Sequence, residues 1–308
     1  MNRLLLIDTF NYVHRAYHAL PKAFKDKDGN PTNAVYGFSS MLISTIDILK
    51  PTHVIAAFDE LTQPTDRSKE FSAYKATRKE TDQDLLVQLP RIEEIISAFG
   101  IQKMILPGYE ADDIIGCVAM QAEKLGFDVI IVSNDKDILQ LLSPHVRVFQ
   151  PDSSKEGGKF FGVGEFREKY GFEPMQMVDY KALRGDLSDN IPGVFGIGEK
   201  IASDLIQKYT TVENLYEHIN DIKPEGLKNK LMHGYESAVL SKRIATIVCD
   251  SSLKFDSEKC KLKEVNRAKA MEEFKKLNFK SLIRRMGFEV EGDKPKETGV
   301  DKSQLHMF

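Results

Sequence analysis

Two aspartates, Asp186 and Asp189, stand three residues apart in the stretch "RGDLSDNIPGVFGIGEKIA" (184–202), just ahead of a run of glycines. Each half has an ordinary explanation, because Asp favours turns by bonding its own backbone and glycines close connections between helices. Together they place carboxylates that could hold a metal ion beside backbone amides that could hold a phosphate. The other acids of the chain can test this hypothesis.

Seven more acids stand at the ends of predicted strands or at a helix start. They are Asp8, Asp59, Glu110, Asp112, Asp113, Asp135 and Asp137. Ligands bind at the carboxyl ends of the strands in an open α/β sheet. One Asp after a strand is more often a turn or helix-cap residue, but three strand ends and an acidic helix start on one edge are harder to explain that way. Carboxylates packed together repel each other, so the cluster predicts bound cations.

The chemistry of these ligands favours hard divalent ions. All of them offer oxygen, with no His or Cys partner nearby, which favours Mg²⁺ or Mn²⁺ over zinc. Nine carboxylates exceed what one ion needs, so we expect two or more ions. Paired divalent ions suit phosphodiester hydrolysis, because one activates the attacking water and the other stabilises the leaving oxygen. Asp186 and Asp189 would be the last ligands, supplied by a helical region.

Composition restricts the classes of protein. The chain has 308 residues, 42% of them hydrophobic, which is typical of a soluble protein of about two domains. No apolar run is long enough to span a membrane, and we expect no signal peptide at the start, which is short and soon acidic. Cys117, Cys249 and Cys260 are odd in number and widely separated, so we expect no disulfide framework, no zinc site and a reducing cytoplasm. Without the nine acids, the formal net charge of −3 becomes +6, so bulk charge does not exclude a polyanionic partner.

Two kinds of periodicity alternate along the first half of the chain. Short β-branched runs predict strands at 3–8, 52–59, 101–106, 128–133 and 146–149, and helical periods lie at 34–49, 84–99 and 110–126. Strands that alternate with helices indicate an α/β fold with a mostly parallel sheet. The strand signal fades from about residue 163 into helical segments. After Gly287 the sequence is polar, which is typical of a disordered tail.

The glycine run predicts a phosphate-binding hairpin. Gly193, Gly196 and Gly198 form Gly-x-x-Gly-x-Gly, but no strand precedes it, which argues against a dinucleotide site. Helical segments on both sides indicate a helix-hairpin-helix at about 174–209, a motif that grips the DNA backbone without reading its sequence. The expected DNA-binding residues here are Gly193, Gly196, Ile197, Gly198 and Lys200.

A basic segment follows Asp59. The stretch "ELTQPTDRSKEFSAYKATRKETD" (60–82) mixes basic residues with Phe71 and Tyr74. A solvated charged loop is one explanation. The interleaved aromatics favour another, in which the segment stacks single-stranded bases while its cations bind phosphates.

These stretches together resemble the 5′ nuclease (flap endonuclease) family, and most of all the 5′→3′ exonuclease domain of bacterial DNA polymerase I in a stand-alone form. The matching motifs span about residues 3–210: "LLLID", "TNAVYGF", "AAFDE", "FSAYKATR", "LPGYEADDIIG", "SNDKDILQL" and "LRGDLSDNIPGVFGIGEKIA". The resemblance implies a PIN-like nuclease core at 1–165 with an arch at about 60–84, and a helical DNA-binding domain at 166–287. The implied substrates are 5′ flaps, nicked or gapped duplex and RNA primers.

The resemblance also implies residue roles. The first metal site would comprise Asp8, Asp59, Glu110, Asp112 and Asp113, and the second Asp135, Asp137, Asp186 and Asp189. Lys75 and Arg78 on the arch would neutralise charge at the scissile phosphate, Arg15 would help to hold it, and Tyr74 would belong to the arch. The hairpin of relatives binds a monovalent cation, commonly potassium. Thr9, His14 and Asn134 depart from the usual motifs. Thr9 and His14 would affect substrate preference rather than the reaction, and Asn134 need not displace Asp135, because Asn tolerates a left-handed backbone.

Two other functions compete with this one. A haloacid-dehalogenase-type phosphatase also begins with "LLLID" but needs an Asp where this chain has Phe10. A non-catalytic binder of branched DNA would use only the arch and the hairpin, and it predicts decayed acids, whereas all nine remain.

The end of the chain, 288–308, carries one more candidate. Gln304, Leu305, Met307 and Phe308 follow the polar tail and resemble the short peptide that binds the bacterial sliding clamp. A stray apolar terminus is the alternative. Otherwise, we expect a monomer with no membrane association.

Overall fold

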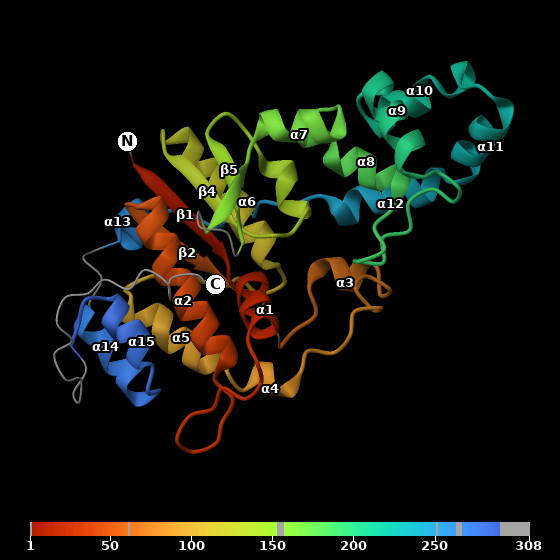
Figure 1. The fold of residues 1–308 in the computed structure, drawn as a ribbon. Helices are drawn as coiled ribbons and strands as arrows, with labels where there is room; N and C mark the ends of the chain where they lie inside the picture. The colour runs from red at the N-terminus through yellow and green to blue at the C-terminus, as the bar shows by residue number, and fades with distance from the viewer. Residues whose placement is uncertain (1, 61, 153–156, 251, 263–266, 290–308) are drawn as a thin grey trace.

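The computed structural model describes residues 2–60, 62–152, 157–250, 252–262 and 267–289. Its centre is a six-stranded sheet with the order β3-β2-β1-β4-β5-β6 (Figure 1). The strands are β1 (Arg3–Asp8), β2 (His53–Ala57), β3 (Gln102–Met104), β4 (Asp128–Val132), β5 (Val146–Pro151) and β6 (Gly158–Phe161). The first five are parallel, and β6 is antiparallel to β5. The expected mostly parallel α/β core is therefore confirmed, although β6, only four residues long, was not predicted.

Alternate residues of the strands point to the two faces of the sheet. Leu5 and Ile7 belong to the cluster that includes α1 (Thr9–Ala19), α2 (Asn33–Leu49) and α5 (Leu89–Ala98). Leu4 and Leu6 belong to the cluster on the opposite face, with α6 (Ala111–Lys124). Both faces are covered by helices, which explains why these strands are continuous apolar runs rather than alternating ones.

The sheet order brings the predicted acids to one edge. Strands β1 and β4 are neighbours, and the chain connects outward from them in opposite directions, so the carboxyl ends of β1 and β4 flank a switch point. Asp8 ends β1, Asp59 follows β2 by two residues, and Asp135 follows β4 by three. The region between β2 and α5 holds the short helices α3 (Asp66–Glu70) and α4 (Gln83–Leu86) (Figure 1).

The observed helices differ from the predicted ones in two places. The segment 84–99 divides into α4 and α5, because Pro90 in the first turn of α5 suits a helix start and not a helix interior. The helix α1 was not predicted, although Tyr12, Val13 and Ala16 form its buried side.

After β6, the regular elements of the described chain are all helical, and one short helix, η1 (Asp137–Leu141), lies earlier, between β4 and β5. The helices after β6 are α7 (Val163–Tyr170), η2 (Pro174–Gln176), α8 (Met177–Arg184), α9 (Glu199–Tyr209), α10 (Val212–Glu217), η3 (Ile219–Asp221), α11 (Glu225–His233), α12 (Tyr235–Ala245), α13 (Ser257–Cys260), α14 (Arg267–Lys276) and α15 (Lys280–Arg285). The hairpin 185–198 joins α8 to α9, and α12 packs along α8. The last two helices return to the α/β core, where Phe274 and Leu282 join the cluster of α2 and α5. In the part of the chain that the structure describes, no helix is long and apolar enough to cross a membrane.

The expectation that the cysteines form no disulfide is wrong for one pair. Cys117 of α6 forms a disulfide with Cys249, which follows α12 and lies 132 residues after Cys117 in the sequence. Cys260 is free and buried. The wide spacing was misleading, because the fold brings the end of α12 back to the middle of α6.

Candidate active site

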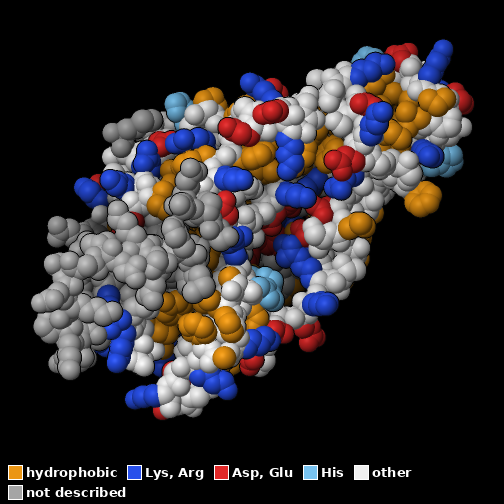
Figure 2. Space-filling model, in the orientation of Figure 1, with side chains coloured by type: hydrophobic (Ala, Val, Ile, Leu, Met, Phe, Trp, Pro, Cys, Tyr) orange, Lys and Arg blue, Asp and Glu red, His pale blue; other side chains and the backbone are white. Residues whose placement is uncertain are grey.

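A cleft of about 810 Å³ opens at the carboxyl edge of the sheet. Five of the nine predicted acids line it: Asp8, Asp59, Glu110, Asp112 and Asp135. The predicted cations Arg15, Lys75 and Arg78 line it too. Figure 2 shows a hollow on this face in which acidic side chains lie deep and Lys and Arg side chains lie around them. The structure therefore brings together residues from strand ends, a helix start and the segment between β2 and α5.

Asp8 and Asp59 are placed by the backbone that surrounds them. Asp8 accepts the Asn11 N–H at 3.2 Å, which caps α1, and the Ser133 hydroxyl at 2.8 Å. Asp59 accepts the Ala111 N–H at 2.9 Å at the start of α6. Burial, with the nearby Asp59 and Asp135 charges, raises the pKa of Asp8 from 3.8 to about 7. Burial also raises the pKa of Asp59.

Glu110 and Asp112 lie beside two cations, Lys75 and Arg67. Lys75 Nζ lies 2.8 Å from Glu110 Oε2, and Arg67 Nη1 lies 2.8 Å from the same atom and 3.3 Å from Asp112 Oδ1. Burial alone would raise the pKa of Glu110, but Lys75 and Arg67 outweigh it and lower that pKa. For Asp112, burial outweighs Arg67 and raises the pKa to about 8. Asp112 therefore faces the cleft with much of its charge uncompensated.

Asp113 lies behind the cleft rather than in its lining. Its Oδ1 accepts Arg67 Nη2 at 2.6 Å and the Val248 N–H at 2.8 Å. Its Oδ2 accepts Arg67 Nη1 at 2.9 Å and the Glu110 N–H at 3.1 Å, the latter as part of a capping box. With both oxygens engaged, this carboxylate positions Arg67 and the start of α6.

The second predicted group of acids is organised by a lysine that the sequence reasoning missed. Lys181 of α8 is buried and forms ion pairs with Asp137 and with Asp186, the latter at 2.6 Å. Lys181 outweighs burial and lowers the pKa of Asp186 to about 2. The available signal was a lysine within the buried run of α8, five residues before Asp186, because a lysine is rarely buried without a carboxylate partner.

Asp135 and Asp189 complete this group. Asp135 accepts the Asp137 N–H at 2.9 Å, and burial raises its pKa despite the nearby Lys181. Asp189 is buried and accepts Arg78 Nη2 at 2.5 Å. Asp137, Asp186 and Asp189 are not part of the cleft lining.

The interpretation of Phe71 and Tyr74 as exposed stacking side chains does not fit this geometry. Tyr74 is 6% exposed, its hydroxyl lies 3.0 Å from Glu110 Oε2, and its ring joins a cluster with Ile191 and Ile244. Phe71 packs against the same cluster and is half-buried. Aromatic side chains next to a buried apolar patch gain more from burial than from exposure.

The basic segment is also fixed to the helical region by its backbone. The Lys75 N–H donates to the Asp189 carbonyl at 2.9 Å, and the Asn190 side chain donates to the Ala73 carbonyl at 2.7 Å. Lys75 adopts a left-handed backbone conformation with φ 55°, which is uncommon for a residue other than glycine and often marks functional sites. The position of Lys75 over the cleft therefore depends on the loop that carries Asp189.

The hairpin residues divide into two groups. Gly193 is buried, and a side chain there would come within 2.2 Å of the Gly185 backbone nitrogen, so its role is close packing. Ile197, predicted to contact DNA, is 4% exposed and belongs to the core, so only its backbone could do so. Gly196, Gly198 and Lys200 are exposed, as is Phe195 at 95%, which was not predicted.

The charge balance of the cleft suits divalent cations, although no three of its described carboxylates converge closely enough to form a metal site as they stand. Among the described residues, Asp8, Asp59 and Asp135 form no ion pair, although Asp8 is buried, Asp59 and Asp135 are half-buried, and all three line the cleft. Their donors are oxygens, the ligands that Mg²⁺ and Mn²⁺ prefer. Carboxylates in this arrangement must take up protons or bind cations.

Two family models cover most of the chain. The "5'-3' exonuclease, N-terminal resolvase-like domain" matches residues 3–171, and the "5'-3' exonuclease, C-terminal SAM fold" matches residues 172–268. The chain belongs to the 5′-3′ exonuclease family. Its members are metal-dependent nucleases, and both the predicted fold class and the predicted family are confirmed.

Curated relatives support the same family. The chain is 40% identical over 287 residues to DNA polymerase I of Caldicellulosiruptor bescii, covering 92% of this chain and 33% of that protein. It is 42% identical over 287 residues to DNA polymerase I of Bacillus caldotenax, covering 92% of this chain and 32% of that protein. The chain thus spans about a third of the length of these relatives.

Solved structures share the fold at low sequence identity. Phage T5 5′-exonuclease with bound zinc matches with a TM-score of 0.66 at 19% identity, covering 92% of this chain and 98% of that one. The catalytic core of Rad2 with a DNA substrate matches with a TM-score of 0.61 at 15% identity, covering 92% of each chain.

Replacing Asp8 by Asn should stabilise the metal-free protein at pH 8 by about 1–3 kcal/mol. Because the pKa of Asp8 is raised to about 7 in the folded protein, its neutral carboxyl group stabilises the fold fully below about pH 4. This stabilisation is lost as the pH rises through about 7. Asn keeps the acceptor for the Asn11 N–H without the charge. Urea denaturation with EDTA at pH 5 and pH 8 measures this, with the exposed Asp47→Asn as control. Equal stability of native and Asp8→Asn protein at pH 8 would contradict the assigned charge balance.

Proposed function

We propose that this chain is a structure-specific nuclease, a 5′→3′ exonuclease and 5′-flap endonuclease that hydrolyses phosphodiester bonds with two or more divalent ions. The observation that carries the proposal is the cleft in which Asp8, Asp59, Asp112 and Asp135 stand with raised pKa values and without sufficient cationic partners. Family membership supports the reaction class. A non-catalytic binder of branched DNA has no need for such a costly cluster.

The acids would hold Mg²⁺ or Mn²⁺ in two groups. Asp8, Asp59, Glu110 and Asp112 would serve the first, with Asp113 behind them, and Asp135, Asp137, Asp186 and Asp189 the second. Divalent ions in such a cleft supply activation of a water and stabilisation of the leaving oxygen. Structures of phage T5 5′-exonuclease with zinc and of T5 flap endonuclease with DNA and metal ions support a metal-dependent reaction for this fold.

Three cations of the cleft are assigned to the phosphate. Lys75 is bound to Glu110 and Arg78 to Asp189 in this structure, so a phosphate entering the cleft would compete with carboxylates for both side chains. With the acids neutralised by bound cations, Lys75 and Arg78 would be released from Glu110 and Asp189 and could bind the phosphate oxygens. Arg15, which also lines the cleft, would orient the same group.

The exposed part of the hairpin is assigned to duplex DNA. Gly196, Gly198 and Lys200 present backbone and charge at the start of α9, where free amides suit a phosphate. Carbonyl oxygens of this hairpin would hold a potassium ion. Sequence-independent binding of this kind positions the duplex while the cleft acts on the 5′ strand.

The proposed substrates are DNA with a 5′ flap, nick or gap and RNA primer ends, in DNA replication and repair. The DNA polymerase I relatives and the DNA-bound structures of Rad2 and T5 flap endonuclease support this substrate class. Chromosomal DNA as substrate would place the protein in the cytoplasm, and we propose that it acts as a monomer.

Replacing Asp135 by Ala should slow flap cleavage by on the order of a hundredfold or more at saturating Mg²⁺, because a cleft carboxylate is lost. Binding of the flap should persist, since the change also relieves repulsion among the acids. The measurement is cleavage of a 5′-labelled flap with Mg²⁺ and with EDTA, alongside binding by anisotropy. The exposed Asp47→Ala is the matched control. Cleavage by Asp135→Ala at the native rate would refute the assignment. Absent cleavage by the native protein would favour the alternative of a non-catalytic binder, and cleavage that EDTA does not abolish would contradict the metal-dependent mechanism.

Replacing Gly198 by Val should weaken binding to every duplex sequence by a similar factor and reduce the salt slope by about one. A Cβ at position 198 would have no protein atom within 4 Å, so the fold should persist and only an approaching phosphate would be obstructed. Gly226→Val on α11, equally open, is the control. Unchanged duplex affinity of Gly198→Val would remove the hairpin from the DNA interface.

We also propose that the peptide Gln304, Leu305, Met307 and Phe308 binds the bacterial sliding clamp. These residues lie outside the described part of the chain, and the support is their pattern alone, a Gln followed by apolar residues that could enter a preformed apolar pocket. Calorimetry should find micromolar binding to the clamp that is lost when residues 304–308 are deleted, with clamp-free flap cleavage unchanged. Equal binding by both forms, or none by either, contradicts this partner.

A further inference from the structure

The segment that follows α12, residues 246–250, lies against α6 and is called the strap here. The Thr246 carbonyl accepts Arg67 Nη2 at 3.0 Å, and the Val248 N–H donates to Asp113 Oδ1 at 2.8 Å. The strap therefore supplies one acceptor and one donor to the Arg67–Asp113 ion pair. Through Arg67, that pair contacts Glu110 and Asp112 of the cleft.

The strap fits its place on α6 closely. Gly116 has no side chain, and a Cβ there would lie 2.5 Å from Ile247 Cγ2, so only glycine lets the strap approach this far. The Gln140 side chain accepts the Ile247 N–H at 3.0 Å and donates to the Ala245 carbonyl at 3.1 Å. These contacts fix the register in which Val248 meets Asp113.

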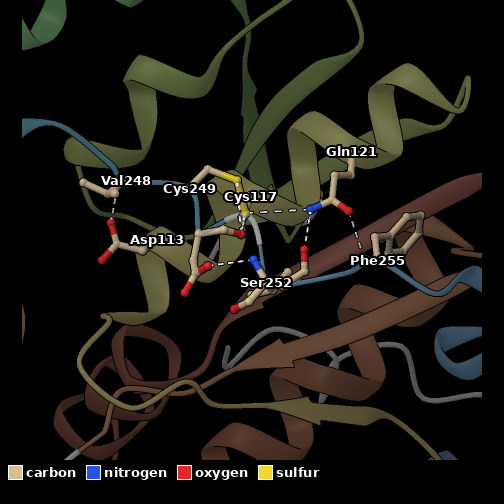
Figure 3. Close-up of a disulfide and its surroundings, with 9 residues drawn as sticks. Asp113, Cys117, Gln121, Val248, Cys249, Ser252 and Phe255 are labelled. Atoms are coloured by element: carbon tan, nitrogen blue, oxygen red, sulfur yellow. Dashed lines mark hydrogen bonds between the residues drawn. A yellow bond between two sulfur atoms is a disulfide. The ribbon is translucent and has the colours of Figure 1, made fainter.

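A disulfide closes the strap onto α6. Figure 3 shows Cys249 bonded to Cys117, with Val248 directed at Asp113 on the preceding turn of the same helix. The two Cα atoms lie 4.7 Å apart, within the range that a disulfide needs. Cys117 is 1% exposed, whereas Cys249 is an exposed residue, so Cys249 is the member of the pair that an external thiolate would approach.

We propose that Cys117 and Cys249 form a reversible thiol–disulfide exchange site, served by a small-molecule thiol and its disulfide such as the glutathione couple, whose oxidised form holds the strap and thereby the first group of metal ligands. The effect on metal binding rests on the proposed function, while the exchange site itself does not.

The oxidation balances with one molecule of oxidised glutathione. The Cys249 thiolate attacks one of its sulfurs, which forms a mixed disulfide and releases one glutathione thiolate. The Cys117 thiolate then attacks the Cys249 sulfur, which forms the protein disulfide and releases the second glutathione thiolate. The two protons of the protein thiols pass through solvent to the two released thiolates. Two electrons are transferred from the protein to glutathione, and an excess of reduced glutathione reverses each step.

Reduction leaves the strap held by hydrogen bonds alone. Opening of residues 246–250 then no longer has to break a covalent link, so the Val248 N–H leaves Asp113 more often and Arg67 loses the Thr246 acceptor. Partners behind metal ligands typically change metal affinity by about 10- to 100-fold when removed. Because reduction loosens these contacts rather than removing them, we expect Mn²⁺ to bind about three- to tenfold more weakly.

The test compares full-length protein equilibrated with oxidised or reduced glutathione. Maleimide labelling under denaturing conditions should count one thiol in the oxidised protein, from Cys260, and three in the reduced protein. Hydrogen–deuterium exchange of residues 246–250 and calorimetric titration with Mn²⁺ alone then follow. Cys249→Ser is the test variant, and Cys260→Ser, which leaves the pair intact, is the matched control.

The proposal predicts faster hydrogen–deuterium exchange in the strap and weaker Mn²⁺ binding in the reduced native protein than in the oxidised native protein. Cys249→Ser should resemble the reduced native protein with either oxidised or reduced glutathione. Cys260→Ser should respond to glutathione as the native protein does. Three labelled thiols after oxidation would overturn the thiol–disulfide exchange site. Hydrogen–deuterium exchange of the strap that is equal in both redox states would overturn the claim that the disulfide holds the strap. If hydrogen–deuterium exchange of the strap differs between the redox states but the Mn²⁺ affinity does not, the coupling between the disulfide and metal binding is overturned. Absence of Mn²⁺ binding in every form would instead contradict the proposed metal centre, and the coupling with it. The hydrogen–deuterium exchange measurements would still decide whether the disulfide holds the strap.

Discussion

The structure depends on a surplus of buried negative charge at one edge of a parallel sheet. The fold itself creates it, because strand ends and a helix start meet at the switch point between β1 and β4. Asp8, Asp59 and Asp135 have hydrogen-bond donors but no ion pair among the described residues. Such an arrangement costs stability when no cation is bound, which is the usual relation between a functional site and the fold that carries it.

The rest of the molecule partly compensates this charge with cations from two places. Arg67 and Lys75 reach Glu110 from the segment between β2 and α5, and Lys181 reaches Asp186 from α8. Because Lys75 also bonds the backbone of Asp189, the segment over the cleft and the helical region that carries the hairpin are mechanically linked. The strap completes the arrangement from behind α6.

The sequence predicted the parts of the site that local pattern determines and missed the parts that tertiary packing determines. Acids at strand ends could be predicted, because an apolar run fixes where a strand stops and the sheet fixes which edge its end reaches. The burial of Tyr74 could not, since nothing local reveals that Ile191 and Ile244 come to cover it. The same holds for the pairing of Cys117 with Cys249, which depends on where α12 ends in space.

The most direct test of the charge surplus is the anomalous scattering of Mn²⁺ in crystals of the full chain. The account predicts at least two Mn²⁺ peaks in the cleft, within coordination distance of Asp8 or Asp112 for one and of Asp135 for another, with Lys75 displaced from Glu110. Crystals that show Mn²⁺ elsewhere on the protein but no peak among these carboxylates would contradict it.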